Sequence, residues 1–246
     1  MKAFGITDKG KIRTENQDSF VIEACVKRGM TVAVICDGMG GAKAGDLASR
    51  LACKEFVSHV YDAVLDGKMR NAVSCRRILS QGCDEANGVV FEYSRFDPDY
   101  NGMGTTLVGG VITRRRAYLV NIGDSRAYHL SRFGIKQISK DHSYVQELVD
   151  SGTISHAEAK VHPKKNIITR ALGVDRKVKS DFFEQPLRFG DAILLCSDGL
   201  SNTVSDSEML SAYRSEKTPE LICRGLLELA LERGARDNVS VAVVKL

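Results

Sequence analysis

Residues 31–41 read TVAVICDGMGG, an apolar and β-prone run that stops at an aspartate beside a glycine. The same kind of junction recurs twice, and a fourth aspartate stands just before the last apolar run of the chain. The later junctions are 118–122 into Gly123-Asp124, 192–197 into Asp198-Gly199, and Asp237 ahead of 239–244. Each run is expected to form a central strand, so the chain should carry four acidic groups at strand ends.

Acidic side chains at strand ends are a common way for a rigid sheet to direct oxygen ligands at one point. Four carboxylates held together would repel one another and raise their pKa values unless divalent cations neutralised them. Oxygen ligands without histidine or cysteine at ligand spacing favour Mg²⁺ or Mn²⁺ over zinc. Any one Asp-Gly junction is typical of a simple turn, and Asp124 could instead pair with Arg126 in a hairpin. Because the junction recurs, the sequence predicts a metal-dependent enzyme.

Length and composition indicate one folded unit of ordinary charge. The 246 residues are 43% hydrophobic, enough for one substantial core, and we expect a single domain over residues 1–246. A net charge of +4, spread along the chain, suits a partner bearing phosphate but does not indicate nucleic acid. The short run Arg114-Arg115-Arg116 is typical of a solvated turn.

Seven cysteines are scattered along the chain without any Cys-x-x-Cys pair. This pattern is typical of reduced proteins and not of disulfide frameworks or zinc sites. The N-terminus lacks the apolar core of a signal peptide, and the apolar runs are far shorter than the roughly 20 residues that span a bilayer. We therefore expect a cytoplasmic protein that does not enter a membrane, and we expect a monomer.

The first half of the chain combines a hairpin with two helices. Residues 21–24 and 31–36 flank a turn at 27–29, which predicts two paired strands. Two helical patterns follow in succession, at about 47–60 and 72–93. Such a helix pair is expected to cover one face of a sheet.

Period-two hydrophobicity returns after residue 104. It predicts strands at 105–112, 117–122, 127–130, 135–138, 181–185 and 192–197. Connections this short favour antiparallel strands, because a parallel crossover needs a dozen or more residues. Residues 141–175 are polar and predict an excursion over the surface, and a last helix is expected between Thr218 as N-cap with Pro219 and a stop at Gly234. This order predicts an α+β fold with helices on the outer faces of antiparallel sheets.

An arginine near the N-terminus is a candidate for binding phosphate. Arg13 on its own is typical of a surface turn, but a guanidinium can bind phosphate oxygens in a bidentate manner. Together with the acids it belongs to a series of short motifs that resembles the metal-dependent protein phosphatase family of the 2C type, in order and from end to end, and most closely its compact bacterial serine/threonine phosphatases. The motifs are Arg13-x-x-Asn16-Gln17-Asp18-Ser19, Asp37-Gly38-Met39-Gly40-Gly41, Gly104-Thr105-Thr106, Gly123-Asp124-Ser125-Arg126-Ala127-Tyr128, Asp141-His142-Ser143, Ser197-Asp198-Gly199-Leu200 and Asp237-Asn238-Val239-Ser240.

The resemblance implies a fold and an activity. The family fold is a β-sandwich of two antiparallel sheets flanked by helix pairs, in four α-β-β-α layers, with a flap that corresponds to about 142–178. The implied reaction is hydrolysis of phosphoserine and phosphothreonine on proteins, by direct attack of a hydroxide that bridges two Mn²⁺ or Mg²⁺ ions. The implied partners are phosphorylated proteins and a cognate serine/threonine kinase, which this signalling enzyme would oppose.

The resemblance also assigns roles to individual residues. The implied metal ligands are Asp18, Asp37, Gly38, Asp124, Asp198 and Asp237, and the implied phosphate-binding residue is Arg13. Asp37 would bridge two ions, Asp198 and Asp237 would complete one site, and the carbonyl of Gly38 would serve the other. Asp124 would bind a third, weaker ion together with Asp198.

The chain departs from the family pattern at two positions. Many bacterial relatives carry histidine directly after the string Asp-Gly-Met-Gly-Gly, as a general acid for the leaving oxygen, where this chain has Ala42 followed by Lys43. Gln17 stands where many relatives have glutamate, beside Asp18, which would act mostly through metal-bound water. We therefore expect the leaving group to take its proton from metal-bound water or from a flap residue.

Two other classes of protein are compatible with parts of the pattern. A non-catalytic module could keep the fold, but such proteins usually lose metal-binding acids, and this chain keeps them. A two-metal nuclease would need a basic groove and stacking aromatics, whereas the aromatic residues here are scattered and tryptophan is absent. The histidines of the flap region, His142, His156 and His162, are expected to be structural rather than catalytic.

Overall fold

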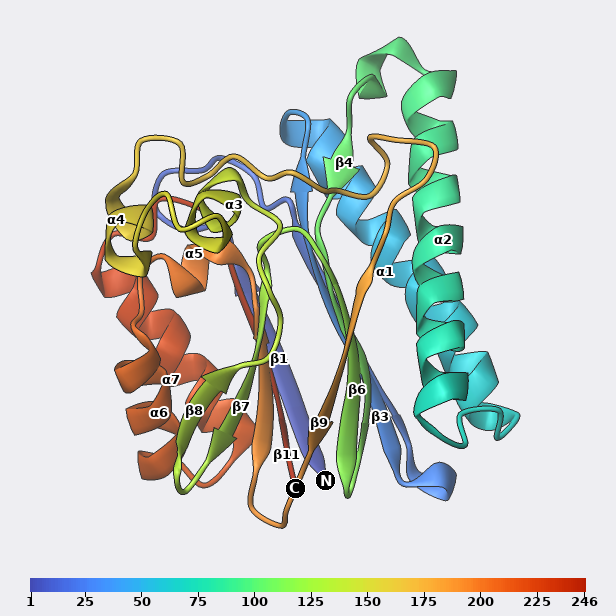
Figure 1. The fold of residues 1–246 in the computed structure, drawn as a ribbon, viewed down its shortest axis with the longest axis vertical. Coiled ribbons are helices and arrows are strands. Elements are labelled where there is room, and N and C mark those ends of the chain that lie inside the picture. Colours follow the sequence, from blue (N-terminus) through green and yellow to red (C-terminus); the bar gives the residue numbers. More distant parts are fainter.

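Two antiparallel sheets pack face to face, and helices cover both outer faces (Figure 1). These features come from a computed structural model that describes the whole chain except the side chain of Ala42, so the departure from the family pattern at that position lies outside the described residues. The layers follow the order helix, sheet, sheet, helix. The predicted α+β sandwich with outer helices is confirmed.

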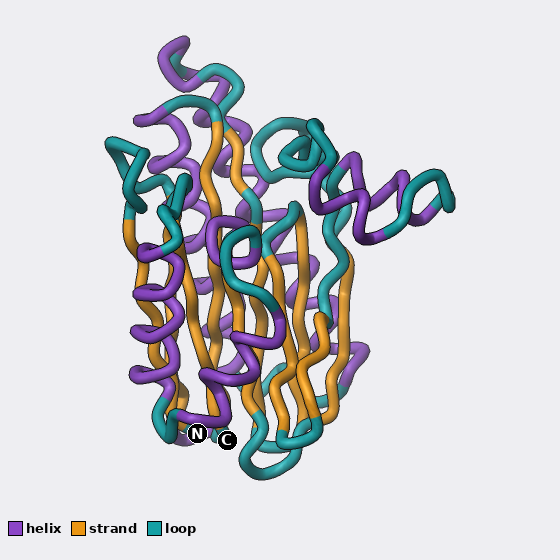
Figure 2. Tube along the Cα trace, turned by 90° about the vertical axis from the view of Figure 1, so that its left-hand side faces the viewer, coloured by secondary structure: helices purple, strands orange, loops and turns teal.

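The first sheet contains five strands and both ends of the chain. In spatial order its strands are β1 (Lys2–Asp8), β11 (Val239–Lys245), β10 (Ala192–Cys196), β7 (Arg126–Ser131) and β8 (Gly134–Gln137). Lys2 of β1 pairs with Lys245 of β11, so the two termini lie together at one end of the sandwich (Figure 2). Helices α6 (Asp206–Ser215) and α7 (Pro219–Glu232) cover the outer face of this sheet.

The second sheet contains six strands. They are β2 (Asp18–Cys25), β3 (Met30–Met39), β5 (Leu107–Thr113), β6 (Arg116–Ile122) and β9 (Asp181–Pro186), with β4 (Gly104–Thr105) paired to the end of β3. A 3₁₀ turn, η1 (Val26–Arg28), followed by Gly29 in the left-handed region, joins β2 to β3 as the predicted hairpin. Helices α1 (Ala42–Leu65) and α2 (Ala72–Phe96) cover the outer face, and η2 (Pro98–Tyr100) follows α2.

The central strands are buried on both faces. On β3, Val34 and Cys36 pack in the core beneath α1 and α2, whereas Ala33 and Ile35 pack in the core between the two sheets. Strand β11 divides its residues in the same way between the α6–α7 side and the core between the sheets. This burial on two sides explains why the strands read as continuous apolar runs rather than as alternating patterns.

The strand predicted at 31–36 is longer than expected. It continues through Asp37 to Met39, because Gly38 and Met39 pair with β4. The predicted strand at 105–112 accordingly divides into β4 and β5, with a break at Thr106. Asp37 therefore lies inside a paired strand, which restricts its backbone more than a turn would.

The short connection after β6 does not form a hairpin. Strands β6 and β7 belong to different sheets, and residues 123–125 cross from one sheet to the other. The hairpin considered for Asp124 is therefore wrong. The crossing places Asp124 at the open end of the sandwich, between the two layers.

The last helix begins and ends as predicted, but its neighbour was not foreseen. The Thr218 hydroxyl accepts a hydrogen bond from the Leu221 amide at 3.3 Å, Pro219 opens the helix, and Gly234 follows it with φ of 94°. Helix α6 was not predicted, although Ser205 and Glu208 form a capping box at its start. Among the described residues, no helix is both long enough and apolar enough to span a bilayer.

Candidate functional site

Four aspartate side chains from four separate stretches of the chain line one cavity of about 370 Å³. These side chains are Asp37, Asp124, Asp198 and Asp237, and the wall also includes Arg13 and Gly38. The cavity lies at the end of the sandwich where Asp8 of β1 meets Val239 of β11, opposite the chain termini. The structure thus brings together every predicted site residue except Asp18, which lies behind the wall.

Burial and mutual repulsion raise the pKa values of Asp37, Asp124 and Asp198. Burial is the largest cause at each position, and repulsion among the carboxylates adds to it. The pKa of Asp124 is raised to about 8 and that of Asp198 to about 6, while the pKa of Asp37 is raised well above its usual range. Such a cluster favours the binding of protons or of cations.

Asp18 is the most enclosed of the predicted acids. It stands directly across from Asp37 in the pairing of β2 with β3, and only 5% of its surface is exposed. Its Oδ2 accepts hydrogen bonds of 2.7 Å from the hydroxyls of Ser197 and Ser240, whereas its buried Oδ1 has no partner. Burial raises the pKa of Asp18 to about 7. The side chain is therefore placed to act on the site from behind, through the other acids or through water.

Asp198 also presents a free oxygen. It is the first residue of the short helix α5 (Asp198–Ser201), and its Oδ2 accepts a hydrogen bond of 3.0 Å from the side-chain amide of Asn202. Its Oδ1 is buried and has no hydrogen-bond partner. An unpaired, buried carboxylate oxygen is costly, and a cation is the kind of partner that would satisfy it.

The predicted phosphate-binding arginine already contacts a predicted metal ligand. Arg13 Nη2 lies 2.8 Å from Asp237 Oδ2, and this hydrogen bond raises the pKa of the guanidinium. Both side chains are partly exposed, at 50% and 38%. A partly exposed ion pair of this kind contributes little to stability, so the arginine could exchange the carboxylate for another anion at small cost.

Close backbone packing fixes the glycine at the end of β3. A Cβ at Gly38 would stand 2.0 Å from the carbonyl oxygen of Gly45 on α1, so no other residue fits without moving the helix. Gly40 and Gly41, which follow Gly38 in the chain, adopt positive φ values of 108° and 97°, a conformation that favours glycine. The side-chain amide of Gln17 donates a 2.6 Å hydrogen bond to the Gly41 carbonyl. This departure from the family pattern therefore stabilises the glycine turn.

Several other residues of this region have supporting roles that their sequence motifs did not reveal. Asn238 holds the loop that carries Arg13. Its side-chain Nδ2 donates to the carbonyls of Lys9 and Glu15, and its Oδ1 accepts from the backbone amide of Gln17 at 2.8 Å. The roles of Ser197 and Ser240, which bind Asp18, were likewise not predicted. Ser197 directly precedes Asp198, whereas Ser240 lies inside the last apolar run and has no acid beside it.

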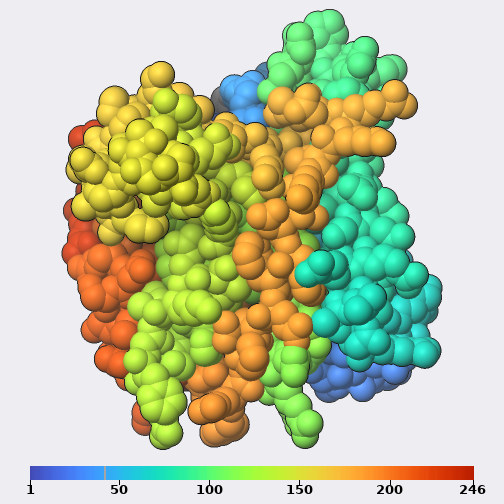
Figure 3. Space-filling view, in the orientation of Figure 1, coloured from blue at the N-terminus to red at the C-terminus, as the bar shows by residue number. Residues whose placement is uncertain are grey.

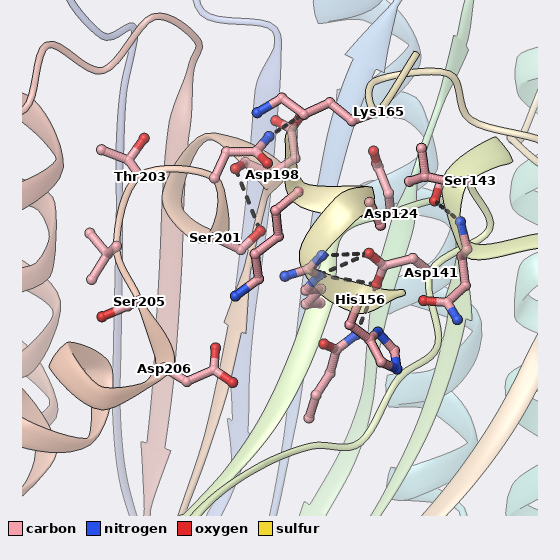
Figure 4. Close-up of a pocket in the computed structure, with 18 of the residues that line it drawn as sticks. Asp124, Asp141, Ser143, His156, Lys165, Asp198, Ser201, Thr203, Ser205 and Asp206 are labelled. Atoms are coloured by element: carbon pink, nitrogen blue, oxygen red, sulfur yellow. Dashed lines mark hydrogen bonds and ion pairs between the residues drawn. The ribbon is translucent and has the colours of Figure 1, made fainter. Parts of the chain in front are cut away.

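A second cavity, of about 610 Å³, adjoins the first and shares Asp124 and Asp198 with it (Figure 4). It lies between the helices of the flap region, α3 (Tyr144–Asp150) and α4 (His156–Val161), and the segment from α5 to α6. Figure 3 shows this flap region as a raised part of the surface. In the cavity wall, Arg126 donates to both oxygens of Asp141, at 2.7 to 3.1 Å.

The chemistry of the donors fits divalent cations, although the carboxylates do not close on one point. Among the described residues, no three histidine, cysteine or acidic side chains lie close enough together to hold an ion as they stand. The fit rests on two unpaired buried oxygens, of Asp18 and Asp198, and on pKa values that are raised mainly by burial and further by the neighbouring carboxylates. Hard carboxylate oxygens of this kind suit Mg²⁺ or Mn²⁺.

Comparison with known proteins gives a consistent relationship. The model of the family described as protein phosphatase 2C matches residues 11–224. The serine/threonine phosphatase stp of Listeria monocytogenes serotype 4b is 38% identical over 240 residues, which cover 97% of this chain and 93% of that protein. The serine/threonine protein phosphatase PstP of Mycobacterium tuberculosis is 38% identical over 237 residues, which cover 96% of this chain but 43% of that longer protein.

Solved structures agree with the sequence relatives. The serine/threonine phosphatase Stp1 from Staphylococcus aureus superimposes with a TM-score of 0.91 at 34% identity, covering 100% of this chain and 95% of that one. The catalytic domain of PstP in complex with two manganese ions superimposes with a TM-score of 0.83 at 34% identity, covering 98% and 96%. The chain therefore belongs to the protein phosphatase 2C family and is a metal-dependent serine/threonine protein phosphatase.

Proposed function

We propose that the acidic cavity is the catalytic site and that it works with two divalent cations. The observation that carries this proposal is the gathering of Asp37, Asp124, Asp198 and Asp237 with Arg13 around one cavity. Asp37 would bridge the two ions, with Asp198 and Asp237 on one side and the Gly38 carbonyl on the other. A relative that was solved with two manganese ions supports this number.

The remaining acids have supporting parts in the proposal. Asp124, together with Asp198, would bind a third and weaker ion at the boundary with the second cavity, which both residues line. Asp18 would act from behind the cavity wall, mostly through water, since its Oδ2 is held by two serine hydroxyls. Its unpaired Oδ1 is the atom available for that contact.

The chain's own residues bind and orient the phosphate. When bound, the cations activate water and offset the negative charge of the phosphoryl group. Arg13 would turn from Asp237 to the phosphate oxygens, which present the same anionic and bidentate geometry. Cations at Asp237 would favour this exchange, because they replace the positive charge that the arginine supplies. The flap, at about 142–178, would border the peptide chain on either side of the phosphorylated residue.

The cellular role follows from the chemistry of the substrate. We propose phosphorylated proteins as substrates and a serine/threonine kinase as the opposing partner, with the protein acting as a monomer in the cytoplasm. Either Mn²⁺ or Mg²⁺ would satisfy the oxygen ligands. Comparison of phosphoproteins between cells with and without the gene would identify the substrates.

Hydrolysis of a phosphothreonine peptide with and without Mn²⁺ tests the proposed site. Asp37→Asn and Asp198→Ala should each lower turnover on the order of 100-fold or more, because each removes a proposed metal ligand. Their circular dichroism spectra should match that of the unmodified protein. Near-normal turnover in either folded variant would contradict the assignment.

A further inference from the structure

A buried histidine at the base of the flap joins the flap to the loop that carries Asp124. His142 follows Asp141 and is 6% exposed. Its backbone amide donates to the Gly123 carbonyl at 2.9 Å, and its ring Nδ1 accepts from the Gly123 amide at 3.2 Å. Both backbone polar groups of Gly123, the residue just before Asp124, are thus hydrogen-bonded to His142, one to its ring and one to its main chain.

These contacts determine which ring nitrogen carries the proton. Because Nδ1 accepts from the Gly123 amide, a neutral ring must carry its proton on Nε2. Nε2 then donates to Asp181 Oδ2 at 3.2 Å. Arg170 Nη1, which also lies 3.1 Å from Nε2, donates to the other oxygen of the same carboxylate at 3.1 Å. Asp181 begins β9, so the ring is held between a strand of the sandwich and the Gly123 backbone.

The same histidine also holds the far end of the flap. The Thr169 amide donates to the His142 carbonyl at 2.8 Å. Next to it, Ser143 pairs with Ile168 in an antiparallel bridge. The segments that lead into and out of the flap are therefore joined at His142 and Ser143, where the flap meets the sandwich.

We propose that His142 is a positioning residue that couples the flap to the placement of the Asp124 carboxylate, and that the hydrogen bond from the Gly123 amide to Nδ1 carries this coupling. The inference rests on the proposed function in one respect, namely that Asp124 binds a cation. A merely structural role would require only that the ring fill its buried position, with Nε2 on Asp181.

Asparagine and glutamine at position 142 distinguish the two roles. The Oδ1 of asparagine falls near the place of Nδ1 and can accept from the Gly123 amide, whereas the amide nitrogen of glutamine falls near Nε2 and can donate to Asp181. His142→Asn should therefore preserve the coupling, and His142→Gln should lose it. His129→Gln serves as the matched control, since His129 makes a similar 2.9 Å contact with Asp191, which lies beside the end of β7 that is remote from Asp124 and Asp198.

The first measurement is amide hydrogen exchange on the metal-free protein. In His142→Gln, exchange should rise together at residues 123–125 and at 167–170, while His142→Asn and the His129 control should leave both segments unchanged. The second measurement is Mn²⁺ titration by calorimetry. The weakest site should lose affinity on the order of 10-fold in His142→Gln, because loss of a group that orients a metal ligand typically has an effect of this size, and the tighter sites should be unaffected.

The outcomes separate this inference from the proposed function. Equal behaviour of His142→Asn and His142→Gln in exchange and in titration would overturn the coupling through Nδ1. Failure of the unmodified protein to bind Mn²⁺ would instead overturn the role of Asp124 as a ligand. The exchange data would still decide whether His142 joins the flap to residues 123–125.

Discussion

At the scale of single residues, the buried acids of the site lower the stability of the folded protein. Asp18 is buried with one unpaired oxygen, and its pKa is raised to about 7 by the loss of solvent. Structural carboxylates are usually paired, and their pKa values are usually lowered. Raised values in a group of neighbouring acids are typical of sites that are built to bind something.

The residue after the glycine turn should decide how the leaving group is protonated. An aryl phosphate leaves easily without an acid, whereas a serine alkoxide does not. Ala42→His should therefore accelerate hydrolysis of a phosphoserine peptide more than hydrolysis of nitrophenyl phosphate. Steady-state kinetics with both substrates measure the difference, and equal effects on the two would reject this explanation.

The sequence indicated the four aspartates that line the cavity, because Asp37, Asp124 and Asp198 stand beside a glycine after an apolar run and Asp237 comes just before one. It did not predict how they are supported. The contact of Arg13 with Asp237 joins residues 224 positions apart, and the serines that bind Asp18 are 179 and 222 positions away from it. Such pairings depend on how the strands are ordered in the sheets, which local patterns do not encode.

At the scale of elements, the end of β3 and the start of α1 form one rigid unit. Gly38→Ala should place a methyl group against the Gly45 carbonyl oxygen and lower the free energy of unfolding by roughly 1–3 kcal/mol. Urea unfolding of the metal-free protein measures this loss. Gly88→Ala is the matched control, because a Cβ there meets nothing within 4 Å and alanine favours the helix α2, by about 0.5–1 kcal/mol. Similar unfolding midpoints for the two variants would contradict the close approach.

Elements with strong local signals were predicted more reliably than those without them. The paired helices α1 and α2 and the capped helix α7 follow from periodicity and from Thr218 and Gly234. The crossing at residues 123–125 could not be predicted, because a short connection between strands has the same sequence pattern whether the strands pair or change sheets. Short α5 carries too few residues for a periodic pattern.

At the scale of the whole molecule, the acidic cavity should make stability depend on pH. Asp18, Asp124 and Asp198 have folded pKa values of about 7, 8 and 6, above the unfolded value of about 3.9. Between about pH 4 and pH 8 these carboxyl groups bind more protons in the folded state than in the unfolded state. Their contribution to stability is therefore greatest below about pH 4 and falls as the pH rises toward 8. Metal-free protein should therefore melt at a lower temperature at pH 8 than at pH 6.

Divalent cations should reverse this trend, because they take the place of the protons. At a free Mn²⁺ concentration 100 times the dissociation constant, binding adds about 2.7 kcal/mol, equivalent to a rise in Tm of roughly 5–10 °C for a chain of this size. The rise should be larger at pH 8 than at pH 6. Thermal melts at both pH values, with Mn²⁺ and with chelator, measure it, and a rise that does not depend on pH would argue against the carboxylates as ligands.

Calorimetric titration of the metal-free protein with Mn²⁺ tests the central claim most directly, because it detects ions without requiring turnover. We predict at least two bound ions per chain, and loss of the tight binding in Asp37→Asn, whose side chain keeps its size but lacks the charge. An unmodified protein that takes up no Mn²⁺, or an Asp37→Asn variant that binds as tightly as the unmodified protein, would contradict the account.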